Sequence, residues 1–289
     1  MLADIPTRVK SILSAYSPDD PALTADQLRA YWLEFEPKSI AGIKAEQRAL
    51  QETVGIPVPV LRAIGKEIAK VVRKQVDAYL PLACLLWDDY GREGRVVTVY
   101  LLGALELAAP ERVVPVILEL CRSCLTWEDA DQLAMRALEP IVRKQPDQWL
   151  PALEPWLVDE SKWVRRAAVT VIGRLTMKHA GYTAHCLELS ARLLLDDEMD
   201  VKRATSFAIR ISARGDLAAV RTFLLAQVPP SDLAATWVLC DVIRSMTKAF
   251  LPEFAALLPR YQEWLADPGL SAKDRRSIES AYNLLRKVT

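Results

Sequence analysis

Trp127 and Asp131 lie four residues apart in the stretch Thr126-Trp127-Glu128-Asp129-Ala130-Asp131. Thr126 followed three residues later by Asp129 is the pattern of a capping box, which predicts a helix beginning at about Trp127. Residues four apart on a helix share a face, so an indole and a carboxylate would project into the same space. An aromatic ring beside an acid suits a ligand that is, or becomes, cationic. The alternative is a core tryptophan and a solvated acid favoured by the helix dipole.

The composition predicts the kind of fold that must position this pair. Of 289 residues, 51% are hydrophobic, and 37 basic and 37 acidic side chains give a net charge of zero, as in ordinary globular proteins. Only 10 residues are glycine, and apolar residues recur at helical spacing, so we expect an all-α protein. We find no apolar run of about eighteen residues and no signal-peptide pattern, and we predict a cytoplasmic location.

The five cysteines are odd in number and lie mostly in apolar helical stretches, as buried reduced thiols do. They are Cys84, Cys121, Cys124, Cys186 and Cys240. Cys121 and Cys124 form a C-x-x-C, but no second pair follows, and His179 and His185 are distant in sequence. Because tetrahedral zinc needs four converging ligands, we expect no metal site and no cofactor.

Proline, aspartate and glycine divide the chain into short helical segments. A helix is predicted at about 6–16, followed by a turn at 17–21, a new helix start at Thr24 and further helix within 26–52. Pro57 and Pro59 predict an extended turn over 54–59 that leads into a helix near Val60. Later helices are expected at 80–87, 92–107, 113–124, 127–144, 149–158, 161–177, 183–195, 217–227, 232–248, 252–266 and 271–287.

Two of these segments resemble each other. Trp163-Val164-Arg165-Arg166-Ala167-Ala168 matches Asp200-Val201-Lys202-Arg203-Ala204-Thr205 at an offset of 37 residues. A period near 40 in paired helices is typical of HEAT-like repeats, which bury their apolar faces on their neighbours. We therefore predict one right-handed α-solenoid of antiparallel helix pairs over 1–289, with capping helices in 1–50 and repeats in 51–289.

The second helix of each predicted pair begins with basic residues, which would line the concave face of a solenoid. They are Arg92, Arg95, Arg165, Arg166, Lys202 and Arg203. From Ser161 to Gly215 there are ten Lys/Arg and five Asp/Glu, a local charge of +5, which leaves 27 basic and 32 acidic residues elsewhere. Basic residues at helix starts fit a phosphate backbone, whereas a solvated, salt-bridged face is the alternative.

Four motifs in this order resemble those of the bacterial alkylpurine DNA glycosylases of the AlkD type, over roughly residues 50 to 215. They are Gly55-Ile56 with Pro59 and Arg62, then Leu86-Trp87-Asp88 with Arg92-Glu93, then Trp127 with Asp131, and finally Trp163-Val164-Arg165-Arg166-Ala167-Ala168. The resemblance implies a monofunctional enzyme that removes cationic N3- or N7-alkylated purines from duplex DNA, without a metal or a lysine nucleophile.

The resemblance also implies roles for individual residues. Asp131 would stabilise the oxocarbenium-like sugar and position the attacking water, while Trp127 packs against the nucleotide. Arg166 would contact the DNA backbone, with Arg165, Lys202 and Arg203 nearby.

The chain departs from the family pattern in two respects, an aromatic residue and the overall charge, and one family contact has two candidates. A later aromatic, usually tryptophan, falls on Phe207, which loses contact area and quadrupole strength. The resemblance also implies an N-terminal aromatic contact with DNA, for which Tyr31 and Trp32 are the candidates. The pI of about 6.8 is low for a DNA-binding protein, which is usually basic.

Two other functions stay open on the sequence. One is a family member that binds damaged or branched DNA without excising a base, which the change at Phe207 permits. The other is a HEAT scaffold that binds protein segments. We expect a monomer that acts on duplex DNA and does not bind membranes.

Overall fold

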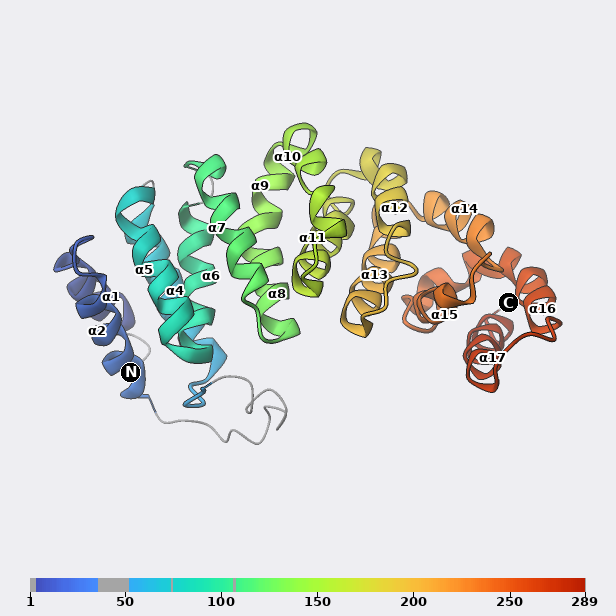
Figure 1. The fold of residues 1–289 in the computed structure, drawn as a ribbon, viewed down its shortest axis with the longest axis horizontal. Helices are drawn as coiled ribbons and strands as arrows, with labels where there is room; N and C mark the ends of the chain where they lie inside the picture. The colour runs from blue at the N-terminus through green and yellow to red at the C-terminus, as the bar shows by residue number, and fades with distance from the viewer. Residues whose placement is uncertain (1–3, 36–51, 74, 106–107, 289) are drawn as a thin grey trace. The chain divides into compact units, whose positions relative to one another are not determined.

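The structure, a computed structural model, describes residues 4–35, 52–73, 75–105 and 108–288. Over these ranges the chain forms helices and no strand (Figure 1). The predicted all-α, solenoid-like class is therefore confirmed. Contacts along the chain divide it into two compact units, Met1–Lys144 and Gln145–Thr289. That the chain forms one continuous solenoid stays a prediction.

The N-terminal unit consists of two layers of helices. In one layer α1, α4 and α6 pack in succession, and in the other α2, α5 and α7 do so. The elements are α1 (Ile5–Ser14), α2 (Pro21–Leu33), α4 (Val58–Val72), α5 (Val76–Asp89), α6 (Gly91–Leu105), α7 (Pro110–Arg122), α8 (Trp127–Leu133), the π-helical turn η3 (Ala134–Leu138) and α9 (Glu139–Lys144).

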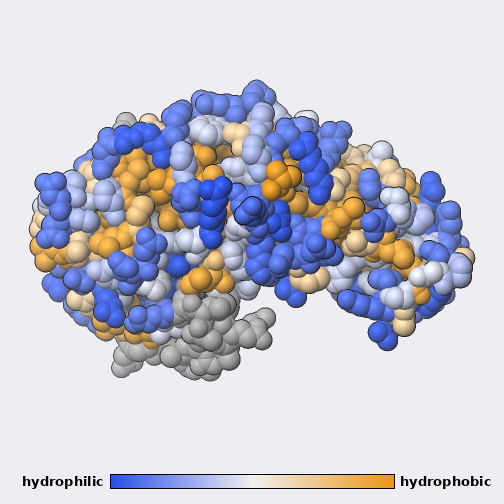
Figure 2. Space-filling view, in the orientation of Figure 1, coloured by the Kyte–Doolittle hydropathy of each residue, from blue (hydrophilic) through white to orange (hydrophobic). Residues whose placement is uncertain are grey.

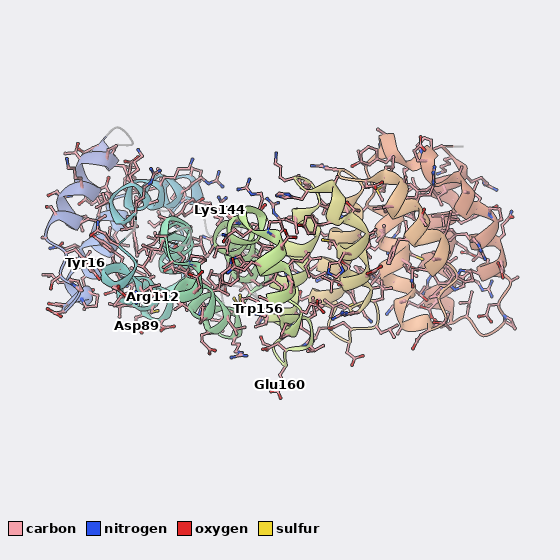
Figure 3. The ribbon with its side chains drawn as sticks, turned by 90° about the horizontal axis from the view of Figure 1, so that it is seen from above. Tyr16, Asp89, Arg112, Lys144, Trp156 and Glu160 are labelled. Atoms are coloured by element: carbon pink, nitrogen blue, oxygen red, sulfur yellow. The ribbon has the colours of Figure 1, made fainter. Side chains whose placement is uncertain are left out.

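The start of α2 differs from the prediction. The helix begins at Pro21 rather than near Thr24, because the Asp20 side chain accepts a hydrogen bond from the Leu23 amide at 3.4 Å and proline suits a first helical position. Most of the helix predicted within 26–52 lies outside the described residues. The hairpin of α1 and α2 is fastened to α5 by Tyr16 (Figure 3), whose ring stacks on Tyr79 at 4.5 Å and whose hydroxyl donates to the Ala78 carbonyl.

The extended turn before α4 is held by a distant carboxylate. The Glu93 side chain of α6 accepts hydrogen bonds from the Gly55 amide at 3.0 Å and from the Ile56 amide at 3.2 Å. It also accepts one from the Thr53 hydroxyl at 3.0 Å. Gly55 has a φ of 88°, which disfavours a residue with a Cβ. The first two matched motifs, Gly55-Ile56 and Arg92-Glu93, are thus joined as one structural unit.

The C-terminal unit repeats the layered arrangement. In one layer α11, α13, α15 and α17 pack in succession, and α12, α14 and η7 form the other. The elements are α10 (Pro146–Ala152), η4 (Pro155–Val158), α11 (Lys162–Leu175), η5 (Ala180–Tyr182), α12 (Thr183–Ala191), α13 (Met199–Ser212), α14 (Leu217–Gln227), η6 (Leu233–Ala235), α15 (Thr236–Arg244), η7 (Lys248–Leu257), α16 (Leu258–Leu265) and α17 (Ala272–Arg286).

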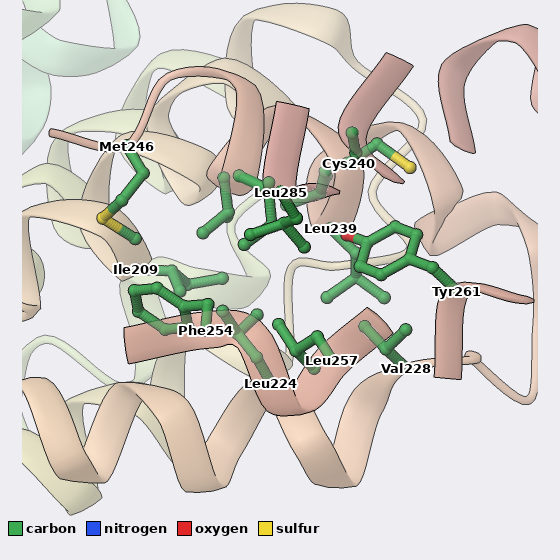
Figure 4. Packing of buried hydrophobic residues seen from close by; sticks show 14 of the residues in the cluster. Ile209, Leu224, Val228, Leu239, Cys240, Met246, Phe254, Leu257, Tyr261 and Leu285 are labelled. Carbon is green, nitrogen blue, oxygen red and sulfur yellow. The ribbon is translucent and has the colours of Figure 1, made fainter. Parts of the chain in front are cut away.

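Consecutive helix pairs of the C-terminal unit share one core. Ile209 of α13, Leu224 of α14, Leu239 of α15, Phe254 of η7 and Leu285 of α17 belong to a single buried cluster (Figure 4). Because no pair buries its apolar face alone, each depends on its neighbours for stability.

Polar contacts also join equivalent positions of successive repeats. Trp87 donates to Ser123, 36 residues on, at 2.9 Å; Ser206 donates to Asp241, 35 residues on, at 2.7 Å; and Arg244 donates to Ser277, 33 residues on, at 2.8 Å. The structural repeat is therefore 33 to 36 residues at these contacts, somewhat shorter than the period near 40 suggested by the sequence.

Candidate active site

The capping box at the start of α8 is present as predicted. The Thr126 hydroxyl accepts from the Asp129 amide at 3.3 Å, and the Asp129 carboxylate accepts from the Thr126 amide at 3.1 Å. The same carboxylate accepts from the Leu125 amide at 3.1 Å. These hydrogen bonds fix the start of α8, the helix that carries Asp131, at Trp127.

Two arginines of α6 hold this helix start from the side. Arg95 Nη1 lies 3.0 Å from Asp129 Oδ2, and its guanidinium lies over the Trp87 ring, 4.6 Å from the ring centroid. Arg92 donates two hydrogen bonds to the Glu128 carboxylate, from Nε at 3.3 Å and from Nη2 at 3.1 Å. Both arginines are buried. Of the two alternatives for these arginines, phosphate binding and ion pairing within the protein, the structure supports ion pairing, since their donors fasten α8 to α6.

The exposed side of α8 carries the tryptophan. Asp129, Ala130 and Leu133 are buried, whereas Trp127 is 45% exposed and Asp131 is partly buried. Trp127 is one of the large hydrophobic side chains left at the surface. On the face drawn in Figure 2, hydrophobic residues appear as separate patches among hydrophilic ones. The interpretation of Trp127 as a core residue is therefore wrong, and the indole can meet a ligand.

The turn that follows Asp131 is wider than an α-helical turn. Residues Ala134–Leu138 form a π-helix, a conformation often found at functional sites. Arg136 donates to Gln132 at 2.7 Å and lies over the Tyr100 ring at 4.8 Å. A Cβ on Gly103 would come within 2.7 Å of the Arg136 carbonyl oxygen. The prediction of an unbroken α-helix over 127–144 is therefore wrong, and in the sequence only Gly103, within an apolar helix, indicates this close approach.

Arg165 and Arg166 lie on α11 in the C-terminal unit. Arg165 contacts Asp196 at 2.7 and 3.2 Å and donates to the carbonyls of Asp159 and Glu160 at 2.8 and 3.0 Å. Arg166 is buried, and one of its nitrogens donates to the Asp200 carbonyl at 2.5 Å. Arg165, which we predicted to bind DNA, is therefore occupied in joining α11 to the loop before α13.

Lys202, Arg203 and Phe207 share α13. Arg203 is 61% exposed and lies 3.6 Å from Asp200. Lys202 is partly exposed, and its side chain makes no hydrogen bond or ion pair with any other described residue. Phe207 is partly exposed, and the Arg210 guanidinium covers its ring at 5.1 Å. Of the predicted basic residues in this unit, Lys202 and Arg203 are the ones most available to an anionic ligand.

The predicted N-terminal aromatic contact is not at the surface. Tyr31 is 3% exposed and Trp32 is fully buried. Burial, together with Asp4 and Glu34, raises the pKa of the Tyr31 phenol, whose oxygen has no hydrogen-bond partner among the described residues. Since α2 places both rings in the core, neither can touch DNA without movement of the helix. Their aromatic identity did not reveal which face of α2 is buried.

All five cysteines are thiols that take no part in a disulfide. Burial raises the pKa of both Cys186 and Cys240 to about 12, so these thiols stay protonated and weakly nucleophilic near neutral pH. Over the described ranges, no group of three or more His, Cys, Asp or Glu side chains could hold a metal ion. No described helix is long and apolar enough to cross a membrane.

These features define an all-α protein of stacked helix pairs with an exposed indole beside a carboxylate on one helix and available cations on another. The chain belongs to the DNA alkylation repair enzyme family, whose model matches residues 33–232. Membership assigns it a role in the repair of alkylated DNA.

Other comparisons are weaker. The crystal structure of smu.31 from Streptococcus mutans UA159 aligns with a TM-score of 0.49 and 17% identity, over 66% of this chain and 99% of that one. No curated protein matches the chain.

Proposed function

We propose that the protein is a monofunctional DNA glycosylase that removes cationic N3- or N7-alkylated purines from duplex DNA. The observation that carries the proposal is the exposed Trp127 one turn before Asp131, on a helix whose start is held by two arginine–carboxylate contacts. Catalytic groups need such support, because small displacements weaken a stabilising charge.

The chemistry follows from the lesion. Alkylation at N3 or N7 makes the purine cationic, so it leaves as a neutral base with the electrons of the N-glycosidic bond and needs no general acid. The C1′ atom becomes oxocarbenium-like, and the oxygen of water bonds to it while a proton is released. In this proposal the Asp131 carboxylate stabilises the positive sugar and orients the water, and the Trp127 ring packs against the nucleotide. The products are the free base and an abasic site.

The DNA contacts of the proposal lie on α11 and α13. Lys202 and Arg203 meet phosphates, Phe207 supplies an aromatic contact, and Arg166 contacts the backbone. Arg165 does not contact DNA in this proposal, because its donors bind groups within the protein. Its role is to hold α11 in position. No metal or cofactor takes part, and a monomer suffices.

Base release tests the proposal directly. Purified protein is incubated with methylated duplex DNA, and free 3-methyladenine and 7-methylguanine are measured together with abasic sites. Release of either base with matching abasic sites supports the glycosylase. A protein that binds the same duplex but releases nothing would instead be a non-catalytic DNA-binding member of the family. The smaller aromatic ring of Phe207, where the family usually has tryptophan, is the feature that favours this alternative.

A further inference from the structure

A small pocket lies at the starts of three successive helices in one layer of the C-terminal unit. Its volume is about 210 Å³, and its lining includes Lys202 of α13, Trp237 of α15 and Lys273 of α17. Lys273 lies 41 positions beyond residue 232, where the family match ends. The pocket therefore combines two residues from the matched region, Met199 and Lys202, with others outside it.

The pocket-lining positions continue the basic series predicted from the sequence. Arg166, Lys202, Trp237 and Lys273 are spaced 36, 35 and 36 residues apart. This spacing agrees with the contacts between successive repeats, such as Ser206 with Asp241 at 35 residues. The repeat thus brings Lys202, Trp237 and Lys273 to similar places on neighbouring helices.

Both lysines are available to a ligand. The side chains of Lys202 and Lys273 make no hydrogen bond or ion pair with another described residue, and Lys273 is exposed. The acid in the pocket, Asp274, is engaged within α17: the Ser271 hydroxyl donates to its carboxylate at 2.5 Å, and its amide donates back to that hydroxyl at 3.1 Å. The pocket therefore offers two unpaired positive charges against one engaged carboxylate.

Most of the remaining lining is apolar, and the exception is Ser277, whose hydroxyl accepts a hydrogen bond from Arg244 at 2.8 Å. Met199 and Leu233 are exposed hydrophobic side chains beside the partly buried Trp237. A volume of about 210 Å³ is below the roughly 300–1,000 Å³ of sites that enclose a small molecule. These dimensions fit one segment of a larger molecule whose remainder lies outside the pocket. Such a segment would have a compact apolar part and an anionic part. A deoxyribose with its phosphate is such a ligand.

We propose that this pocket binds a sugar-phosphate unit of the DNA backbone, with the phosphate between Lys202 and Lys273 and the sugar against Trp237. The inference rests on the DNA binding in the proposed function and extends it past the family-matched region. The proposed occupant of the pocket is duplex DNA. A free nucleotide has the same sugar and phosphate groups, and the experiment below distinguishes the two.

The test compares Lys273→Gln with a matched control, Lys178→Gln. Lys178 is also exposed and lies beyond the end of α11, at the other end of the helix layer from the pocket. Duplex affinity is measured by fluorescence anisotropy over a series of salt concentrations. Loss of one phosphate contact should lower the slope of log K against log salt by about 0.9 and weaken binding roughly three- to tenfold near 0.1 M salt. Lys178→Gln should match the parent, and Lys273→Arg should restore both values.

The outcomes separate the two proposals. If the parent binds duplex DNA and releases bases while Lys273→Gln behaves like Lys178→Gln, the pocket inference is overturned and the glycosylase stands. If the parent binds no duplex, both fall. A deoxynucleoside monophosphate that binds the parent but not Lys273→Gln, with duplex affinity unchanged, would overturn the DNA assignment in favour of a free nucleotide.

Discussion

Arg95 of α6 and Asp129 of α8 form an ion pair at 3.0 Å, with side chains only 10% and 5% exposed. Asp129 lies two residues before Asp131, and its carboxylate also accepts from two backbone amides at the helix start. A buried pair is costly to break from one side, because the remaining charge has no partner. The pair thus connects the stability of the protein with the position of its proposed catalytic carboxylate.

Asp129→Ala should therefore lower the free energy of unfolding by about 3–5 kcal/mol. The control is Asp77→Ala, which removes an exposed contact with Arg112 and should cost less than about 1 kcal/mol. Urea denaturation followed by circular dichroism measures both. Equal, small losses for the two variants would mean that the Arg95 contact does not hold α8.

Asp131→Asn should separate binding from catalysis. The amide keeps the shape of the side chain but removes the charge that stabilises the sugar, so excision should fall by roughly two orders of magnitude or more. Affinity for the same duplex should be equal or slightly higher, because a negative group near phosphates is lost. Single-turnover release of methylated base and equilibrium binding are measured together, with thermal unfolding as the control. Excision at the parental rate would remove Asp131 from the mechanism.

Phe207→Trp should fold normally and excise small alkyl lesions at least as well as the parent. Indole offers more contact area and a stronger quadrupole to a cationic nucleotide than phenyl does. Phe207 is only partly buried, so the larger ring has room to turn outward. A large loss of activity in a folded variant would indicate a site shaped for phenylalanine, such as one for a bulkier lesion.

The double variant Lys202→Glu with Arg203→Glu should weaken binding of damaged and undamaged duplexes alike. Phosphate contacts carry no base information, so their loss lowers affinity uniformly and makes the remaining binding less sensitive to salt. Arg165→Met, in contrast, should chiefly lower stability, because Arg165 contacts Asp196 and two carbonyls rather than solvent. Duplex titrations at several salt concentrations compare the two. If the double variant binds duplex DNA as tightly as the parent, the basic residues of α13 are solvated and do not contact phosphates.

Gly103→Ala tests the close approach between α6 and the π-helical turn. Its methyl group would lie 2.7 Å from the Arg136 carbonyl oxygen, so the backbone must shift, at a cost of about 1–3 kcal/mol. Gly181→Ala is the control, because a Cβ there meets nothing within 4 Å. Chemical denaturation of both variants gives the difference. If Gly103→Ala is as stable as Gly181→Ala, the turn adapts freely and is not fixed by this contact.

Local interactions made much of the fold predictable from the sequence. Helical periodicity indicated the all-α class, because burial of one helix face repeats every few residues. The start of α8 at Trp127 followed from a capping box, whose hydrogen bonds join residues three apart. The run of basic residues was also visible, since its members recur at the repeat interval.

Tertiary structure decided which of these residues are available. Arg92, Arg95 and Arg165 looked like Lys202 in the sequence, but their partners Glu128, Asp129 and Asp196 lie 31 to 36 residues away. Pairing over that separation depends on how successive helices stack, which no local pattern records.

The same reason explains the other differences. Tyr31 is buried because α2 packs against α1 and α5, and the turn after Asp131 widens where Gly103 of another helix approaches it. The sequence by itself determined most of the helices and the spacing of Trp127 and Asp131 on one of them, but neither the start of α2 nor the π-helical turn. Long-range packing alone decided which charges fasten the helices together and which remain free to meet a ligand, because burial and ion pairing depend on neighbours brought together only by folding.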